Sequence, residues 1–258
     1  MAPRVAWITV APVKGLALVH RDTVRLEPFG VRENRRFHLI GEDGRLLNGK
    51  QLEPLVQVTP AWDEDAGTLA LRFPGGGVVA GEVELGEAVV TNFYGRRDVE
   101  GRLVVGPWAD ALSSFVGLPV RLVQPVEPGA GLDRGRGAVS ILSTGSLEAL
   151  RAAAGEAQPV DARRFRMLLG VEGVGPHEED SWLGRRVRVG DAEVEVQGNV
   201  GRCLVTSRDP DTGETNLPTL DLLAAYRGDV ETTEPLPFGV WASVTEPGVV
   251  RLGDPVVV

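Results

Sequence analysis

The chain contains a single cysteine, Cys203, within the stretch NVGRCLVTSRDPDTGETN at 199–216. A free cysteine is most often a small buried hydrophobic side chain, which is one interpretation of this position. Its surroundings favour another, because Arg202 precedes it and nearby cations stabilise the thiolate, the form that attacks electrophiles and binds metals. The residues after Cys203 have a strand-like pattern and end in DPDTG at 209–213, which is typical of a rigid turn. We therefore predict a thiol at the start of a strand, facing a cavity.

Basic residues lie beside short apolar stretches at several places in the chain. They are Lys14, Arg35 and Arg36 before Phe37, Arg134 and Arg136 in a glycine-rich loop, and Arg163, Arg164 and Arg166 around Phe165. For any one arginine, a solvated strand edge or a surface ion pair is the ordinary role. In a strand, alternate side chains share a face, so Arg164 and Arg166 are expected to point the same way. Several such cations in an acidic protein could converge on one anionic ligand.

Other familiar chemical motifs do not occur in the sequence. Gly75–Gly77 has neither the dinucleotide-binding nor the phosphate-loop spacing, and a hairpin turn is the better interpretation. The histidines His20, His38 and His177 share no metal-ligand spacing. One cysteine excludes an internal disulfide, a four-thiolate iron–sulfur cluster and a zinc site built on several thiolates. Electrons for a redox reaction must then come from another source.

The composition is that of a folded acidic protein. Hydrophobic residues make up 43% of the 258 residues, which is enough for one large core or two modest ones. A net charge of −9 disfavours a general nucleic-acid binder, because the overall field repels a polyanion. The sequence has no export signal and no run of 18 or more apolar residues, so we expect a cytoplasmic protein without a membrane span.

Alternation of apolar and polar residues predicts mostly strands. Three hairpins are expected, at 69–83, 186–196 and 249–258. Three short helices are expected, at 109–117, 143–156 and 217–229. Strands and helices do not alternate regularly along the chain. The pattern therefore favours a mainly antiparallel β architecture with inserted helices over a doubly wound parallel sheet.

Seven stretches of the chain together resemble a known family. They are PVKG (12–15), NRRFHLIGEDGRLLNGKQLEP (34–54), LSTGSLEAL (142–150), ARRFR (162–166), EDSWLGRRVRVGD (179–191), GRCLVTSRDPDTG (201–213) and FGVW (238–241). In this order they resemble MOSC-domain proteins with an N-terminal β-barrel-like region, the group that includes the mitochondrial amidoxime-reducing components. The Arg-Cys pair followed five residues later by DPDTG is the most specific part. The glycine- and charge-rich stretch at 126–137 places a domain boundary just before it, near residue 118. With that boundary, the resemblance implies a β-barrel-like region at 1–118 and an antiparallel β-barrel MOSC domain at 119–258.

The resemblance also implies a site for a molybdenum–molybdopterin cofactor. In similar proteins the cysteine that matches Cys203 is a protein ligand of molybdenum, which makes it the expected metal ligand and catalytic residue. The positions that hold the cofactor in those proteins match Lys14, Gly15, Arg36, Arg136, Gly137, Arg166, Gly201, Arg202 and Trp241. The residue chemistry agrees, because a phosphate-bearing pterin needs Lys and Arg donors and a soft metal accepts a thiolate.

Four positions depart from the family pattern. Met167-Leu168 follows Arg166 where the family commonly has Pro-Asn, so one amide contact to the cofactor is missing. Gly15 stands in place of a serine, and Gly201 in place of another small hydroxyl residue. Backbone N–H groups can replace the lost side-chain donors, because glycine lets the chain approach a ligand closely.

The activity that the resemblance implies is the reduction of small N-hydroxylated molecules such as amidoximes, hydroxylamines and N-hydroxylated bases. Oxygen would pass to reduced molybdenum, and an external flavoprotein, ferredoxin or cytochrome would supply the electrons. Two alternatives stay open at this point. Cys203 could carry sulfur as a persulfide, or the domain could deliver the molybdenum cofactor without turnover. Cys203 could also be a buried thiol in a β-domain that binds another anion.

Overall fold

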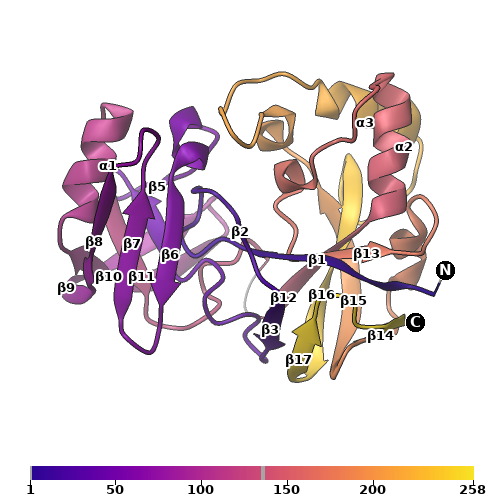
Figure 1. Ribbon diagram of the computed structural model, residues 1–258, viewed down its shortest axis with the longest axis horizontal. Coiled ribbons are helices and arrows are strands. Elements are labelled where there is room, and N and C mark those ends of the chain that lie inside the picture. The colour runs from indigo at the N-terminus through magenta and orange to yellow at the C-terminus, as the bar shows by residue number, and fades with distance from the viewer. Residues whose placement is uncertain (1, 135–136) are drawn as a thin grey trace.

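The computed structural model describes residues 2–134 and 137–258, which form two β-rich lobes (Figure 1). The larger sheet has eight strands in the order β18 (Val256–Val257), β14 (Arg186–Val189), β15 (Ala192–Gly201), β16 (Pro237–Glu246), β12 (Ala138–Ser143), β13 (Leu169–Glu172), β1 (Arg4–Val10) and β2 (Val19–His20). Its neighbouring strands are antiparallel except for β12 and β13, which run parallel. The predicted fold class, mainly β with few helices, is confirmed.

The second lobe, on the left of Figure 1, contains the other large sheet. Its five strands lie in the order β5 (Leu46–Leu47), β4 (His38–Ile40), β11 (Arg121–Pro125), β10 (Arg97–Val105) and β9 (Glu84–Phe93). A three-stranded sheet packs in the same lobe and consists of β6 (Thr59–Asp63), β7 (Thr68–Arg72) and β8 (Val78–Glu82). One further pair joins β3 (Thr23–Leu26) to β17 (Gly248–Arg251).

The three predicted helices are confirmed. They are α1 (Trp108–Val116), α2 (Thr144–Ala154) and α3 (Thr219–Arg227). Ser143 caps α2 by accepting a hydrogen bond from the Ser146 N–H, as its position before the apolar repeat predicts. Four short 3₁₀ helices complete the described elements: η1 (Glu53–Gln57), η2 (Ala162–Phe165), η3 (Glu178–Trp182) and η4 (Leu204–Ser207). No helix within the described residues is both long and apolar enough to cross a bilayer.

Two of the three predicted hairpins are confirmed, and the third is wrong. β7 pairs with β8, and β14 pairs with β15, each across the expected turn. At the C-terminus, however, β17 pairs with β3 and β18 pairs with β14, so the two strands do not pair with each other. Both β3 and β14 offer backbone partners from distant parts of the chain, and these non-local pairings replace the local one.

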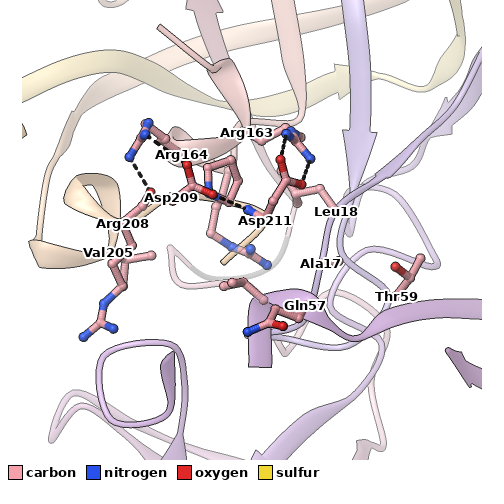
Figure 2. Close-up of a pocket in the computed structure, with 13 residues that line it drawn as sticks. Ala17, Leu18, Gln57, Thr59, Arg163, Arg164, Val205, Arg208, Asp209 and Asp211 are labelled. Atoms are coloured by element: carbon pink, nitrogen blue, oxygen red, sulfur yellow. Dashed lines mark hydrogen bonds and ion pairs between the residues drawn. The ribbon is translucent and has the colours of Figure 1, made fainter. Parts of the chain in front are cut away.

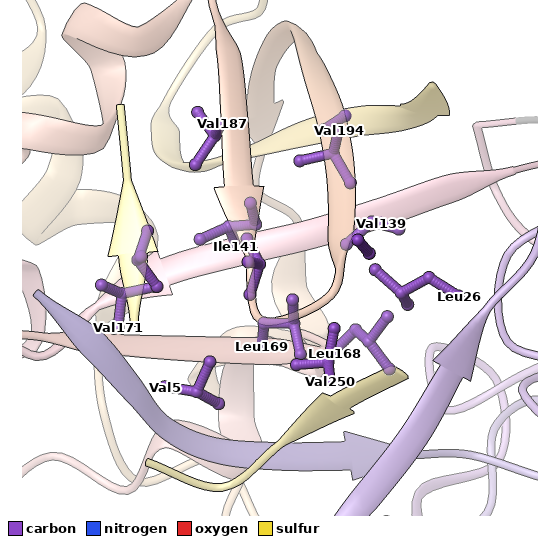
Figure 3. Close-up of a cluster of buried hydrophobic side chains, with 14 of the residues drawn as sticks. Val5, Leu26, Val139, Ile141, Leu168, Leu169, Val171, Val187, Val194 and Val250 are labelled. Atoms are coloured by element: carbon purple, nitrogen blue, oxygen red, sulfur yellow. The ribbon is translucent and has the colours of Figure 1, made fainter. Parts of the chain in front are cut away.

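The largest hydrophobic core lies under the eight-stranded sheet and is rich in valine (Figure 3). Val5 and Leu26 from the start of the chain pack there with Val139, Val194 and Val250 from the second half. In the sheet, β1 lies next to the edge strand β2 and pairs with β13 on its other side. The first strand is thus built into the lobe formed mainly by the C-terminal half, and the proposed division of the chain into 1–118 and 119–258 stays a prediction.

Two segments expected to be strands are 3₁₀ helices. Arg163 and Arg164 lie in η2, and Arg166 follows it with φ of 55° in the left-handed region. Cys203 lies after the end of β15 and directly before η4, not at the start of a strand. There the Thr206 N–H and hydroxyl both donate to the Cys203 carbonyl, each at 3.0 Å, which turns the chain away from an extended path.

Candidate functional site

A cavity of about 440 Å³ lies where the two lobes meet, and Cys203 is part of its wall. Lys14, Asn48 and Tyr94 line it from the N-terminal half, and Phe165 and Trp241 line it from the C-terminal half. Its volume is within the usual range of small-molecule sites. The structure therefore places the thiol beside a cavity, as predicted. Its backbone, however, precedes a 3₁₀ helix and does not start a strand.

The cavity gathers positive charge in a chain whose net charge is −9. Its described lining includes two carboxylates, Asp133 and Glu234, and eight cationic side chains: Lys14, Arg35, Lys50, Arg96, Arg134, Arg164, Arg166 and Arg202. Arginine and lysine at this density attract anions, and arginine matches the geometry of phosphate and carboxylate groups. The cavity is suited to an anionic ligand.

The end of β15 fixes the position of Cys203. Gly201 pairs with Pro237 of β16, and the Arg202 N–H donates to the Leu236 carbonyl at 3.1 Å. Cys203 is a free, half-buried thiol, and it directly follows this anchored pair. A partly exposed sulfur on the wall of a cationic cavity can ligate a metal or carry sulfur, whereas a sealed thiol could do neither.

The Arg202 guanidinium donates hydrogen bonds mainly to backbone carbonyls near Cys203. Its Nε donates to the Phe238 carbonyl at 2.8 Å, and its Nη1 donates to the Phe165 carbonyl at 3.0 Å. Burial, with Arg134 as a further cause, lowers the pKa of Arg202 to about 9. The side chain thereby ties the residue before Cys203 to β16 and to the end of η2.

Met167 occupies the position where the resemblance led us to expect a different residue. The side chain is 2% exposed and lines the cavity, and its Sδ accepts a hydrogen bond from Arg202 Nη2 at 2.9 Å. Leu168 is buried in the main core. A thioether and an aliphatic side chain thus stand where similar proteins place an amide, and the polar contacts of this wall come from the neighbouring arginines.

Lys14 forms the deepest cationic position of the cavity. The side chain is 5% exposed, its Nζ donates to the Gly131 carbonyl at 3.3 Å, and it forms an ion pair with Asp133. Burial is the largest cause that lowers the pKa of Lys14, Asp133 raises it and Arg35 lowers it, and the net pKa is about 8. Although burial would raise the pKa of Asp133, the charges of Lys14 and Arg35 hold it well below its usual range.

Arg35 and Arg166 bring two guanidinium groups to the same wall. Both residues have φ of 55°, and Arg35 Nη2 donates to the Arg166 carbonyl at 3.3 Å. Burial and the charge of Arg35 lower the pKa of Arg166 to about 10. Neither guanidinium has a carboxylate within ion-pair distance among the residues that the structure describes. Two neighbouring half-buried cations of this kind are less favourable unless an anion joins them.

Gly201 is required by the close approach of Glu234. The Gly201 N–H donates to Glu234 Oε2 at 2.9 Å, and the two carboxylate oxygens of Glu234 also bind the guanidinium of Arg134. A Cβ atom on residue 201 would lie 2.7 Å from Glu234 Oε2 and 2.8 Å from the Pro235 carbonyl oxygen. Any larger residue would displace this carboxylate and the arginine that it holds.

Most of the cofactor-binding positions expected from the sequence lie together at this cavity. Those that line it are Lys14, Gly15, Arg166, Gly201, Arg202, Cys203 and Trp241. Arg36 does not: its Nη1 donates to the Pro125 carbonyl at 2.5 Å, and the Gln124 amide oxygen faces its guanidinium. Gly137 is buried against the Pro28 carbonyl and is not part of the lining. Arg136 lies outside the described residues.

The structure adds residues that sequence reasoning missed or left unresolved. Arg35, beside Arg36, is the member of the pair that lines the cavity. Lys50, Tyr94 and Arg96 also line it. Lys50 lies in the stretch 34–54 that carries the resemblance but was not singled out there, and Tyr94 and Arg96 come from a turn that matches no motif. The sequence contained one usable signal, the two adjacent arginines before Phe37, but alternation cannot choose between neighbours when the backbone at Arg35 is left-handed.

A smaller cavity of about 160 Å³ adjoins the first and shares Val56, Arg164, Arg166 and Val205 with it (Figure 2). Its charges are largely paired. Arg163 binds Asp211 at 2.7 Å, and Asp209 lies 3.7 Å from Arg164. The DPDTG segment forms the predicted turn, in which Asp209 Oδ1 accepts from the N–H groups of residues 211 and 212. Residues 209–211 of this turn form part of the wall of the smaller cavity.

Comparison with known proteins agrees with this arrangement. A family model described as the MOSC N-terminal beta barrel domain matches residues 2–104, and one described as the MOSC domain matches residues 127–257. Mitochondrial amidoxime reducing component 2 of Bos taurus is 29% identical over 98% of this chain and 82% of its own length. A molybdenum cofactor sulfurase of Oryza sativa subsp. japonica is 37% identical over 27% of this chain and 8% of its own length.

Among solved structures, the YUAD protein from Bacillus subtilis is similar with a TM-score of 0.45 and 11% identity, covering 99% of this chain and 94% of that one. The sequence match is the stronger finding, because the MOSC domain model by itself accounts for just over half of the chain. The protein belongs to the MOSC-domain family.

Proposed function

We propose that the protein is a molybdopterin-dependent reductase of small N-hydroxylated compounds. The observation that carries the proposal is the half-buried Cys203 thiol on the wall of a cavity lined by eight cations. Support also comes from relatives named as amidoxime reducing components that match almost the entire chain. Such compounds include amidoximes, hydroxylamines and N-hydroxylated bases.

The residues present fit the proposed cofactor in three respects. The thiolate of Cys203 is a soft ligand of the kind that a molybdenum already held by sulfur accepts. The neighbouring Arg35 and Arg166, with the buried Lys14, suit the phosphate of a pterin. Among the described residues, Lys14 has one carboxylate partner, Asp133, and the two arginines have none within ion-pair distance. Phe165 and Trp241 give the same cavity apolar walls against which a flat ring system can pack.

The chain's own residues then have distinct roles. Cys203 would hold the metal, and Arg202 would keep the backbone of Cys203 in place through the Phe165 and Phe238 carbonyls. Lys14, with a pKa of about 8, is mostly charged at neutral pH and can bind an anion. These groups position and desolvate the reactants, which is the usual contribution of a protein to cofactor chemistry.

The reaction cleaves a nitrogen–oxygen bond. The N-hydroxylated substrate takes up two electrons and two protons and leaves as the N–H product and water. When bound, the cofactor supplies the two-electron redox chemistry. A single cysteine in the chain leaves no set of thiolates for an iron–sulfur cluster. We therefore propose an external electron donor, such as a flavoprotein, a ferredoxin or a cytochrome.

The test is reduction of benzamidoxime with chemically reduced methyl viologen as electron donor. Protein produced in a host that makes the cofactor should form benzamidine, and Cys203→Ala should abolish turnover, since the metal loses its protein ligand. Lys14→Arg is the matched control and should retain activity, because the charge stays. No benzamidine from the unaltered protein, together with cyanide-labile sulfur that is lost in Cys203→Ala, would instead support a sulfur carrier.

A further inference from the structure

Among the residues that the structure describes, two exposed cations of the cavity lining have no ion-pair partner. Lys50 and Arg96 are both exposed and both line the cavity. Over the part of the chain that the structure describes, neither the Lys50 ammonium nor the Arg96 guanidinium forms a hydrogen bond or an ion pair. The Lys50 Nζ does lie over the ring of Tyr94, 5.8 Å from its centroid. Both side chains are free to bind an incoming negative group.

Both carboxylates that line the cavity are already paired with a cation. Asp133 pairs with Lys14, and Glu234 binds Arg134 through both carboxylate oxygens. Arg96 is close enough to help lower the pKa of Glu234 but forms no contact with it. The two carboxylates that line the cavity are thus already engaged, and the exposed Lys50 and Arg96 add positive charge that they do not neutralise.

Tyr94 provides a flat surface beside Lys50, and Arg96 follows it two residues later in the same turn. Its side chain lies in the turn between β9 and β10, with φ of 59°, and 48% of its surface is exposed. Asn48 Nδ2 donates to its hydroxyl at 3.4 Å, and the Lys14 Nζ lies 5.8 Å from the ring centroid. An exposed ring held in this way can stack an aromatic ligand while neighbouring cations bind a negative substituent on that ligand.

We propose that Lys50, Tyr94 and Arg96 form a specificity site that selects aromatic N-hydroxylated substrates bearing a carboxylate or a phosphonate or phosphate group. The inference rests on the proposed function and adds a substrate class to it. The inner cations Lys14, Arg35 and Arg166 are more deeply placed and are assigned to the cofactor. The outer pair stays hydrated, so it acts on ligand selection, with an attraction that salt weakens.

The experiment compares matched substrates that differ only in charge: benzamidoxime, 4-carboxybenzamidoxime and 4-phosphonobenzamidoxime. The unaltered protein should show kcat/KM about tenfold higher for the carboxylate than for the neutral compound at low salt, and higher again for the phosphonate. In the double variant Lys50→Gln, Arg96→Gln this preference should disappear, while kcat/KM for benzamidoxime stays unchanged. Arg45→Gln removes an 86% exposed cation that does not line the cavity, and it should retain the preference.

Two further readouts separate this inference from the proposed function. Calorimetric titration with the same three compounds needs no turnover and should give the same order of affinities. Equal affinities in the unaltered protein would overturn the specificity site even if all three compounds are reduced. A loss of molybdenum in the double variant would overturn it as well, because it would assign Lys50 and Arg96 to the cofactor.

Discussion

Lys14, Arg166 and Cys203 come from three distant parts of the chain and meet at one cavity. Keeping the ammonium of Lys14 and the guanidinium of Arg166 out of water is unfavourable, and the lowered pKa of both groups expresses that cost. Groups with shifted pKa values concentrate at functional sites, because the arrangement that serves a ligand is seldom the most stable one without it. The thiol and its cations are therefore best explained together, as parts of one binding site.

The charge of Lys14 should make anion binding depend on pH. Its pKa of about 8 lies below the usual value of 10.5, so the ammonium that attracts an anion is lost as pH rises through 8. In a Cys203→Ala background, which removes the thiol from the site, the affinity for sulfate should fall about fourfold between pH 7 and 8.5. Isothermal titration calorimetry measures this affinity. Because sulfate keeps its charge between pH 7 and 8.5, the change reports on the protein.

Lys14→Arg is the matched control, because a guanidinium stays charged and should make the affinity nearly constant over the same range. Lys14→Met should bind sulfate weakly at every pH. If the protein with Lys14 intact showed no change in affinity between pH 7 and 8.5, Lys14 would not be part of the anion site.

Residue identity could be predicted only as far as local pattern reaches. Cys203 could be identified because it is a lone thiol beside an arginine, and Lys14 because it lies in a stretch that resembles the family. Both signals can be read from the sequence alone. The choice of Arg35 over Arg36 was not, since it depends on the left-handed backbone at Arg35 and on the Pro125 carbonyl that engages Arg36. Lys50, although it lies in the stretch 34–54, and Arg96 had no signal that placed them at the cavity, because surface turns with a cation are common.

Helices and strands were likewise predictable only where their signals lie close together in the sequence. Helix α2 and the hairpin of β14 and β15 were predictable, since caps, turn residues and periodicity lie within a few residues of each other. The C-terminal pairing was not, because β17 joins β3 from the opposite end of the chain. η4 was also missed, and its strand-like residues pack as a 3₁₀ turn once Thr206 caps the Cys203 carbonyl.

The DPDTG turn after η4 yields a prediction about stability. Gly213 has φ of 83°, and a Cβ there would lie 2.4 Å from the Glu53 carbonyl oxygen in the other lobe. Gly75 has φ of 84° with nothing within 4 Å of a Cβ. Gly75→Ala should therefore cost about 1 kcal/mol for backbone strain alone, and Gly213→Ala about 3 kcal/mol or more, because it adds a clash with backbone.

Urea denaturation of both variants measures these free energies of unfolding. Equal losses would show that the turn does not hold the lobes at the distance seen in the structure. A larger loss in Gly213→Ala would show that the DPDTG turn and the η1 segment form one packed contact, which also sets the width of the cavity beside them.

At the scale of the whole molecule, the two lobes divide the site between them. The acidic chain carries a cationic cavity at their junction, so field lines are concentrated where an anionic ligand is needed. β1 joins the larger sheet, and the segment after it delivers Lys14 to the cavity. Neither lobe contains the complete set of lining residues, and the site depends on how both pack.

The most direct measurement is the molybdenum and pterin content per chain, with X-ray absorption at the molybdenum edge. Protein made in a host that synthesises the cofactor should carry about one of each, and Cys203→Ser should lack one sulfur ligand on any metal it retains. Stoichiometric molybdenum with an identical sulfur environment in both proteins would contradict the central claim, as would a protein free of both metal and pterin.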